Sequence, residues 1–275
     1  MKYAICQELF VDWEWEDQCR VIADAGYAGI EVAPFALAPR ITDVTAERRR
    51  TLRAQAEGHG LTIIGLHWLL AKTEGLHITS PDEITRRRTA AYLAELARAC
   101  ADMGGHILVF GSPGQRSLAP GMTAETGREY AAEVLRECLP TFDERGVTLC
   151  LEPLTTKETN FLTSCAETMQ LVRLIDHPRV QLHQDVKAML HETVSIPELI
   201  RQYAPYVKHF HVNDGNLLGP GMGPTDFAPI FSALRASGYD GWVSVEVFDY
   251  SPGAEKIARE SLAYMRRIVS QLPAR

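Results

Sequence analysis

Short apolar segments alternate with longer amphipathic segments along the whole chain. The apolar segments are rich in β-branched and aromatic residues, which is typical of buried strands, and they cover residues 3–7, 28–33, 61–68, 106–110, 147–152, 179–185, 206–212 and 241–247. The segments between them place apolar residues three and four positions apart, as helices do, near residues 16–25, 45–59, 82–103, 124–145, 163–175, 195–204, 227–237 and 254–270. Eight strand–helix units in 275 residues predict an α/β fold, a (β/α)8 TIM barrel that forms a single domain over residues 1–275.

Glycine residues mark the ends of several predicted helices. Gly26, Gly60, Gly104, Gly146 and Gly238 each stand just before a strand, and they fit helix C-terminal caps, where φ is positive. A doubly wound sheet is the alternative architecture for alternating strands and helices. No G-x-G-x-x-G follows the first strand, however, so the barrel is the favoured fold.

Charge and composition narrow the class of protein. With 28 basic and 35 acidic residues the net charge is −7, which disfavours nucleic-acid binding because neutralising phosphates requires clustered Lys and Arg. The N-terminus lacks the apolar core of a signal peptide, and no stretch approaches the roughly 18 apolar residues that a membrane span requires. The six cysteines include no C-x-x-C pair, as expected in a reducing compartment. We therefore expect a cytoplasmic protein that binds neither nucleic acid nor membrane.

Polar side chains stand where the predicted strands end, which is where a TIM barrel carries its chemistry. Glu152, Asp185, His211 and Glu246 fall at the ends of four successive strands. A buried carboxylate without a partner is costly, so a salt bridge explains any one of these acids, but the four residues together indicate a shared divalent cation. Three carboxylates and one imidazole favour Mn²⁺, with Co²⁺, Mg²⁺ and Zn²⁺ as alternatives.

The segment VKHFHVND contains two histidines that a strand would place on one face. A period of two sends His209 and His211 to one side and Phe210 and Val212 to the other. We interpret His211 as the metal ligand and His209, one layer deeper, as an interior group that supports it. Glu31, at the end of the second strand, is the weakest candidate, because pairing with a neighbouring strand end explains it equally well.

These motifs resemble the xylose isomerase-like TIM-barrel superfamily, and within it the sugar phosphate isomerase/epimerase branch that includes the ketose 3-epimerases. The resemblance rests on Glu152 in LEPL, Asp185 after its strand, His211 in HFHVND and Glu246 in SVEVF, and it extends from GIEV to the last helix. It implies a carbohydrate substrate, a ketose or a sugar phosphate, and it allows a homo-oligomer. It also implies that Glu152 and Glu246 transfer the proton beside the substrate carbonyl, through a metal-stabilised enediolate.

Two departures from the ketose 3-epimerase pattern leave the reaction open. Glu158 matches a substrate-contacting glutamate of those enzymes, although a loop carboxylate would look the same. Ala188 stands where they carry a histidine, and Leu217 stands where they carry an arginine. A dehydratase or lyase acting on a keto-sugar, keto-inositol or 3-keto-glycoside through the same enolate is therefore the alternative. Phosphodiester hydrolysis, known in this superfamily, would require more histidines and a basic face, and a non-catalytic barrel would not explain both glutamates.

Other strand-end residues are candidate substrate contacts. Lys187 could reach a substrate oxygen or enolate, and Arg116 could bind a hydroxyl or a phosphate. His67 and Trp68 stand where an aromatic ring could stack on a sugar face. Asn213 could orient His211 or the substrate. Each also has a structural alternative: a rim ion pair for the lysine, a surface loop for the arginine, core packing for the tryptophan and a turn for the asparagine.

Overall fold

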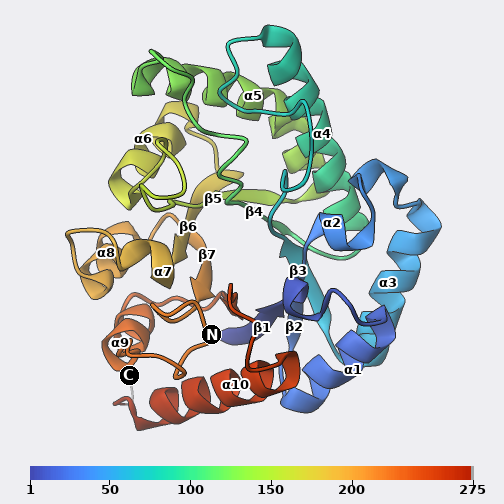
Figure 1. The fold of residues 1–275 in the computed structure, drawn as a ribbon, viewed down its shortest axis with the longest axis vertical. Coiled ribbons are helices and arrows are strands. Elements are labelled where there is room, and N and C mark those ends of the chain that lie inside the picture. The colour runs from blue at the N-terminus through green and yellow to red at the C-terminus, as the bar shows by residue number, and fades with distance from the viewer. Residues whose placement is uncertain (274–275) are drawn as a thin grey trace.

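The computed structural model describes residues 1–273 and contains a closed barrel of eight parallel strands (Figure 1). The strands are β1 (Lys2–Cys6), β2 (Gly29–Val32), β3 (Thr62–Leu66), β4 (Ile107–Phe110), β5 (Thr148–Leu151), β6 (Val180–Asp185), β7 (Val207–Val212) and β8 (Trp242–Val245). Each strand pairs with the next, and β8 pairs with β1 to close the sheet. The predicted (β/α)8 barrel and its eight strands are confirmed, and residues 274–275 of the predicted domain lie outside the described residues.

Within residues 1–273, eight main helices surround the barrel in the predicted order. They are α1 (Trp15–Ala25), α3 (Ala46–Gly58), α4 (Glu83–Asp102), α5 (Ala124–Arg145), α6 (Cys165–Ile175), α8 (Ile196–Tyr203), α9 (Ala228–Ala236) and α10 (Ala254–Gln271). Four shorter turns escaped prediction because they are too brief to show a helical period: the 3-10 turns Gln7–Phe10 and Ile41–Asp43, and the helices α2 (Pro34–Leu37) and α7 (Val186–Met189). The five glycines predicted as caps all have positive φ, from 67° at Gly146 to 98° at Gly26.

The strands separate an outer apolar layer from a partly polar interior. On β7, Phe210 and Val212 pack outward in the main hydrophobic core, while His209 and His211 contact Glu31 inside the barrel. Small apolar clusters fill the interior toward the N-terminal ends of the strands: Ala4 with Ile64 and Trp242, and Ile107 with Val109 and Cys150. The apolar base of the interior therefore supports a polar layer above it.

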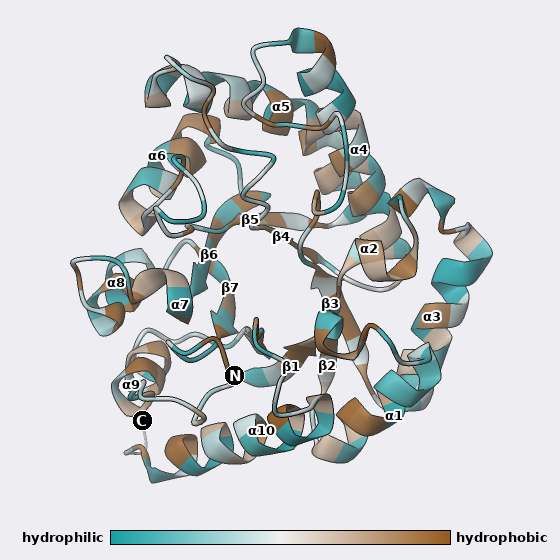
Figure 2. Ribbon diagram, in the orientation of Figure 1, coloured by the Kyte–Doolittle hydropathy of each residue, from teal (hydrophilic) through white to brown (hydrophobic). Residues whose placement is uncertain are grey.

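The outer helices follow the amphipathic pattern of the sequence. Figure 2 shows hydrophobic and hydrophilic positions alternating along helices such as α4 and α10. Their buried positions, such as Leu93 and Leu96 of α4 and Ile257 and Leu262 of α10, join the core between helices and sheet. Within the part of the chain that the structure describes, none of the helices has an apolar stretch long enough to cross a bilayer.

Candidate metal centre and active site

Four side chains from four successive strands converge at the C-terminal end of the barrel. Glu152 directly follows β5, Asp185 ends β6, His211 lies in β7 and Glu246 directly follows β8. Each offers a ligand atom, and these four atoms all lie within 4.8 Å of one another. All four residues are buried. The structure thus brings together the residues that the strand-end pattern selected.

His211 is held at both ring nitrogens. Its Nδ1 lies 3.2 Å from Glu246 Oε2, and its Nε2 lies 3.0 Å from Glu31 Oε2. The same Glu31 oxygen lies 2.9 Å from His209 Nε2. A carboxylate on one ring nitrogen fixes the orientation of an imidazole and raises its basicity as a ligand. Glu31 therefore pairs across the barrel interior with both histidines of β7, which is not a neighbour of β2, and it orients both rings.

Asp185 is held by the asparagine that follows β7. Asn213 Nδ2 donates to Asp185 Oδ2 at 2.6 Å, and Asn213 Oδ1 accepts from the backbone N–H of Lys187 at 2.7 Å. The other Asp185 oxygen accepts from the backbone N–H of Ala188 at 2.8 Å. Asn213 thus orients Asp185, and not His211 as one interpretation of the sequence suggested. The Asn213 side chain links the end of β7 to Asp185 at the end of β6 and to Lys187 just beyond it. Its role is therefore more than that of a turn residue.

Glu246 accepts hydrogen bonds from neighbours on both of its oxygens. The indole N–H of Trp68 donates to Oε1 at 2.9 Å, and His67 Nδ1 lies 3.3 Å from the same oxygen. Trp68 has a φ of 52°, which is rare for a bulky residue. Burial would raise the pKa of Glu246, but His211 and His67 outweigh burial and hold that pKa well below its usual value. Glu246 is therefore kept ionised.

His67 lies behind Glu246 and does not reach open space. Its Nε2 is 3.0 Å from Glu8 Oε2, so the ring is sandwiched between two carboxylates and is fully buried. Burial lowers the pKa of His67, but the neighbouring Cys6 and Glu8 raise it well above its usual value. Sequence reasoning missed Glu8, although it stands just beyond β1 in ICQELF, where the strand-end criterion would have selected it. His67 supports Glu246 and offers no face for stacking on a sugar.

Glu152 has surroundings unlike those of Glu246. Burial raises its pKa to about 8, and the nearby charges of Glu246 and Asp185 add to the effect. Gly111, which follows β4, makes room for this carboxylate, since a Cβ at that position would lie 1.7 Å from Glu152 Oε2. The four-residue cluster contains three buried carboxylates and only one imidazole, so its negative charge exceeds its positive charge. A set of ligands with this excess of carboxylate oxygens fits a divalent cation.

A cavity of about 430 Å³ opens beside these carboxylates. Its walls are Trp68, Gly111, Pro113, Glu152, Leu154, Glu158, Lys187, Glu246 and Phe248. Lys187 Nζ donates to Glu158 Oε1 at 2.8 Å and lies 3.9 Å from the centre of the Phe248 ring. Glu158, Lys187 and Trp68 thus face the space where a substrate would lie. Phe248 was not predicted, although its position two residues after Glu246 places it at the same barrel end.

Arg116 has a different place from the predicted one. It is fully buried, and its guanidinium donates to the backbone carbonyls of Glu152, at 2.6 Å, and of Phe110. The GSPGQR segment turns inward, so the arginine bonds to the ends of β4 and β5. Arg116 therefore supports the backbone that carries Glu152 and does not line the cavity, which leaves Lys187 as the cation beside that space.

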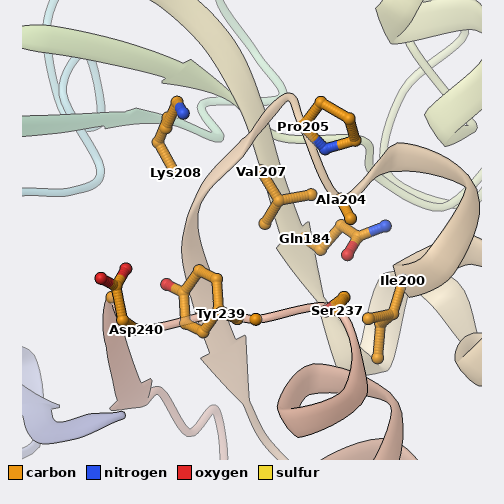
Figure 3. Close-up of a pocket in the computed structure, with 11 residues that line it drawn as sticks. Gln184, Ile200, Ala204, Pro205, Val207, Lys208, Ser237, Tyr239 and Asp240 are labelled. Atoms are coloured by element: carbon orange, nitrogen blue, oxygen red, sulfur yellow. The ribbon is translucent and has the colours of Figure 1, made fainter.

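A second, larger hollow of about 670 Å³ lies at the opposite end of the barrel (Figure 3). It is bordered by residues at the N-terminal ends of β7 and β8, including Val207, Lys208 and Asp240, and by residues of the neighbouring helices. Lys208 and Asp240 are exposed, in contrast to the buried carboxylates of the other cavity. Size alone therefore does not identify the site in this molecule.

Comparison with known proteins identifies related sequences. The family described as xylose isomerase-like TIM barrel matches residues 19–268. The D-psicose 3-epimerase of Ruminiclostridium cellulolyticum is 27% identical over 254 residues, which cover 90% of this chain and 84% of that protein. The 3-dehydro-D-guloside 4-epimerase of Escherichia coli is 24% identical and covers 97% of this chain and 99% of that protein.

Solved structures show the same fold. The crystal structure of a D-psicose 3-epimerase in the presence of D-fructose matches with a TM-score of 0.86 at 21% identity, over 98% of this chain and 99% of that chain. The structure of a 3-keto-D-glucoside 4-epimerase from E. coli matches with a TM-score of 0.82 at 21% identity, over 97% and 99%. At these identities the likeness establishes the fold, and the named relatives are sugar epimerases.

Proposed function

The chain belongs to the xylose isomerase-like TIM barrel family, and from this premise we propose that it is a divalent-metal-dependent sugar isomerase or epimerase. Its substrate is a ketose or a sugar phosphate. The observation that carries the proposal is the pair Glu152 and Glu246, which border one cavity and share a ligand cluster with Asp185 and His211. Named relatives with 24–27% identity that act on ketoses and keto-glycosides support it.

The four clustered residues would hold the ion, and Mn²⁺ is our proposed ion because the donor set is rich in oxygen. When bound, the ion supplies positive charge beside the sugar carbonyl and makes the neighbouring C–H more acidic. Glu31 and Asn213 keep His211 and Asp185 in place for this role. The surrounding protein thus fixes the ligands before the ion arrives.

The two glutamates carry the proton. With no ion bound, His211 and His67 hold the pKa of Glu246 well below its usual value, whereas burial raises the pKa of Glu152 to about 8. A bound cation would lower both pKa values, so the proposed roles of base and acid rest on the placement of the two carboxylates beside one cavity. Glu246 removes the proton from carbon, and Glu152 returns one on the other face. For the reverse reaction the two residues exchange roles.

Lys187 and the aromatic walls position the substrate. Its ammonium, paired with Glu158 over the Phe248 ring, faces the cavity and can donate to a substrate hydroxyl. The Trp68 and Phe248 rings, whose centroids are 6.4 Å apart, offer apolar surface for the C–H face of a sugar. Substrate binding therefore relies on one ion pair and two aromatic rings.

A second candidate reaction is elimination from a keto-sugar, keto-inositol or 3-keto-glycoside. The observation in its favour is the apolar character of the cavity wall, formed by Trp68, Pro113, Leu154 and Phe248. Ala188 and Leu217 stand where the ketose 3-epimerases carry a histidine and an arginine, so two polar groups that would bind a free ketose are replaced by apolar ones. An apolar wall suits the aglycone of a glycoside better than the hydroxyls of a free ketose.

One exchange experiment separates these reactions. The Mn²⁺-loaded protein is incubated in D₂O with free ketoses including D-psicose and D-fructose, with their phosphates, and with 3-keto-glycosides. Deuterium that enters at a single carbon, detected by NMR and mass spectrometry, supports an isomerase or epimerase. Release of water or aglycone supports the lyase. Absence of exchange with all three substrate classes contradicts the proposal, and Asp185→Asn serves as the matched control that lacks one metal ligand.

A further inference from the structure

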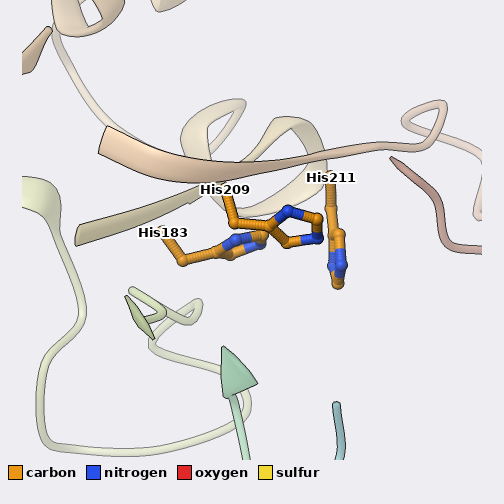
Figure 4. A group of neighbouring side chains, drawn as sticks. All are labelled: His183, His209 and His211. Carbon is orange, nitrogen blue, oxygen red and sulfur yellow. The ribbon is translucent and has the colours of Figure 1, made fainter. Parts of the chain in front are cut away.

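Three histidine rings meet in the barrel interior, one layer deeper than the proposed catalytic ion. His183 and His209 are register partners on β6 and β7, directly below the partners Asp185 and His211. His183, His209 and His211 each offer a ring nitrogen, and these atoms lie within 4.8 Å of one another. Figure 4 shows the three rings side by side, projecting from two neighbouring strands. All three are fully buried.

Several buried polar atoms around these rings lack partners. Within residues 1–273, neither ring nitrogen of His183 makes a hydrogen bond, and the same holds for His209 Nδ1 and Glu31 Oε1. A buried polar group left unpaired costs about 1–3 kcal/mol, and most such groups in folded proteins do find a partner. Four unpaired atoms in one small volume therefore indicate an occupant that binds nitrogen.

The charge of Glu31 beside the three histidines favours a cation at this position. Glu31 touches two of the three imidazoles through Oε2, while its other oxygen is unpaired within the described part of the chain. The Cys6 thiol lies 3.6 Å from Glu31 Oε2 at the edge of the same cluster. Neutral imidazoles bind metal ions well, and a neighbouring carboxylate compensates part of the positive charge.

We propose that His183, His209 and His211 form a second metal site in the barrel interior, which takes a late first-row transition ion such as Zn²⁺. An all-nitrogen set prefers Zn²⁺ or Cu²⁺ to Mn²⁺ or Mg²⁺, in contrast to the oxygen-rich cluster above it. His211 belongs to both sites. Its Nδ1 lies beside Glu246, and its Nε2, which pairs with Glu31 when no ion is bound, would exchange that hydrogen bond for the inner ion, so that a deprotonated ring bridges the two ions. The inner ion stabilises the fold and fixes the ring that the outer ion uses.

Zinc stoichiometry tests this site independently of any sugar. The full chain is stripped with a chelator and loaded with Zn²⁺ alone, and bound zinc is measured by mass spectrometry of the metal. The wild type is expected to hold two ions per chain, and His183→Leu one. Asp185→Asn, which disrupts only the outer cluster, keeps the inner ion, and the Asp185→Asn/His183→Leu double variant holds none. His59→Leu, which removes the histidine that directly follows α3, far along the chain from this cluster, keeps both ions.

The outcomes discriminate clearly. One zinc ion in the wild type, or two in both the wild type and His183→Leu, overturns the inner site. Anomalous diffraction from zinc-loaded wild-type crystals supplies a readout that does not depend on a variant folding. A second peak among the three rings supports the site, whereas a buried water there overturns it. Failure of the sugar exchange experiment together with an inner zinc peak would reject the proposed enzyme function and keep this site.

Discussion

The two ends of the barrel differ in chemistry more than in shape. The hollow at the N-terminal end is larger, about 670 Å³ against about 430 Å³, but its charged residues Lys208 and Asp240 are exposed. The cavity at the C-terminal end has buried Glu152 and Glu246 in its wall. Charged groups removed from water interact strongly with one another and with whatever binds between them. Convergence of buried charge, and not volume, therefore identifies the site.

The two ends of the barrel differ because all eight strands are parallel. Side chains at the C-terminal end of a strand converge on the barrel axis, where Asp185 and His211 in β6 and β7, and Glu152 and Glu246 directly after β5 and β8, come together. The other end of the interior is filled by apolar residues such as Ile64 and Trp242. Apolar packing thus occupies the N-terminal end of the barrel interior, and the candidate ligands occupy the C-terminal end. The following variants test this arrangement.

The largest effect is expected at the ionised glutamate. Glu246→Gln preserves the shape of the side chain but removes the base, so proton transfer should fall about 10³-fold or more. The measurement is the rate of deuterium incorporation into a substrate found in the exchange panel, with circular dichroism as the folding control. A variant that keeps more than a tenth of the wild-type rate would assign the base to another residue.

A smaller loss is expected from crowding the second glutamate. In Gly111→Ala the new Cβ would meet Glu152 Oε2 at 1.7 Å, so the carboxylate must move. Displacement of a catalytic group by about 1 Å costs roughly 10²-fold in rate. Deuterium exchange measures the loss, and Gly114→Ala in the same loop is the matched control, because a Cβ there meets open space. Equal rates for both alanine variants would contradict the position of Glu152.

Arg116 should affect stability and not recognition. Arg116→Met leaves the carbonyls of Glu152 and Phe110 without their buried donor, which should lower the free energy of unfolding by about 2 kcal/mol. Urea unfolding followed by fluorescence measures the change. If the variant instead keeps its stability and loses affinity for phosphorylated sugars only, then Arg116 contacts the substrate as the sequence suggested.

The smallest effect is expected at the opposite end of the barrel. Lys208 is exposed beside the larger hollow, so Lys208→Met should change the free energy of unfolding by no more than about 0.5 kcal/mol. The exchange rate should equal that of the wild type. A clear loss of activity in this variant would show that the N-terminal hollow participates in function, and the contrast between the two ends would then fail.

Much of the fold could be predicted because its signals are local. Each strand and main helix has its own period of apolar residues, and the glycines before β2, β3, β4, β5 and β8 do adopt the positive φ of helix ends. A chain of eight alternating strand–helix units is compatible with only a few folds, and the (β/α)8 barrel is one of them. The four turns that were missed span only three or four residues, too few to carry a period.

Only part of the candidate site could be predicted from the sequence. Glu152, Asp185, His211 and Glu246 could be selected because each ends an apolar strand, and the fold then places them together. Arg116 lies in the loop that follows β4, and this loop turns it toward backbone carbonyls. A strand end predicts position along the barrel axis, but it does not predict which way a long side chain turns.

The sequence by itself determined the eight-fold alternation, the strand that carries each candidate ligand and the acidic character of the set, because these depend on residue type and spacing. Only the tertiary structure decided which partner each group has: Glu31 with both histidines of β7, Asn213 with Asp185, and Trp68 with Glu246. The reason is that these contacts join strands distant in the chain, and closure of the barrel alone sets their register. The same closure places His183 beside His209, which no local pattern could indicate.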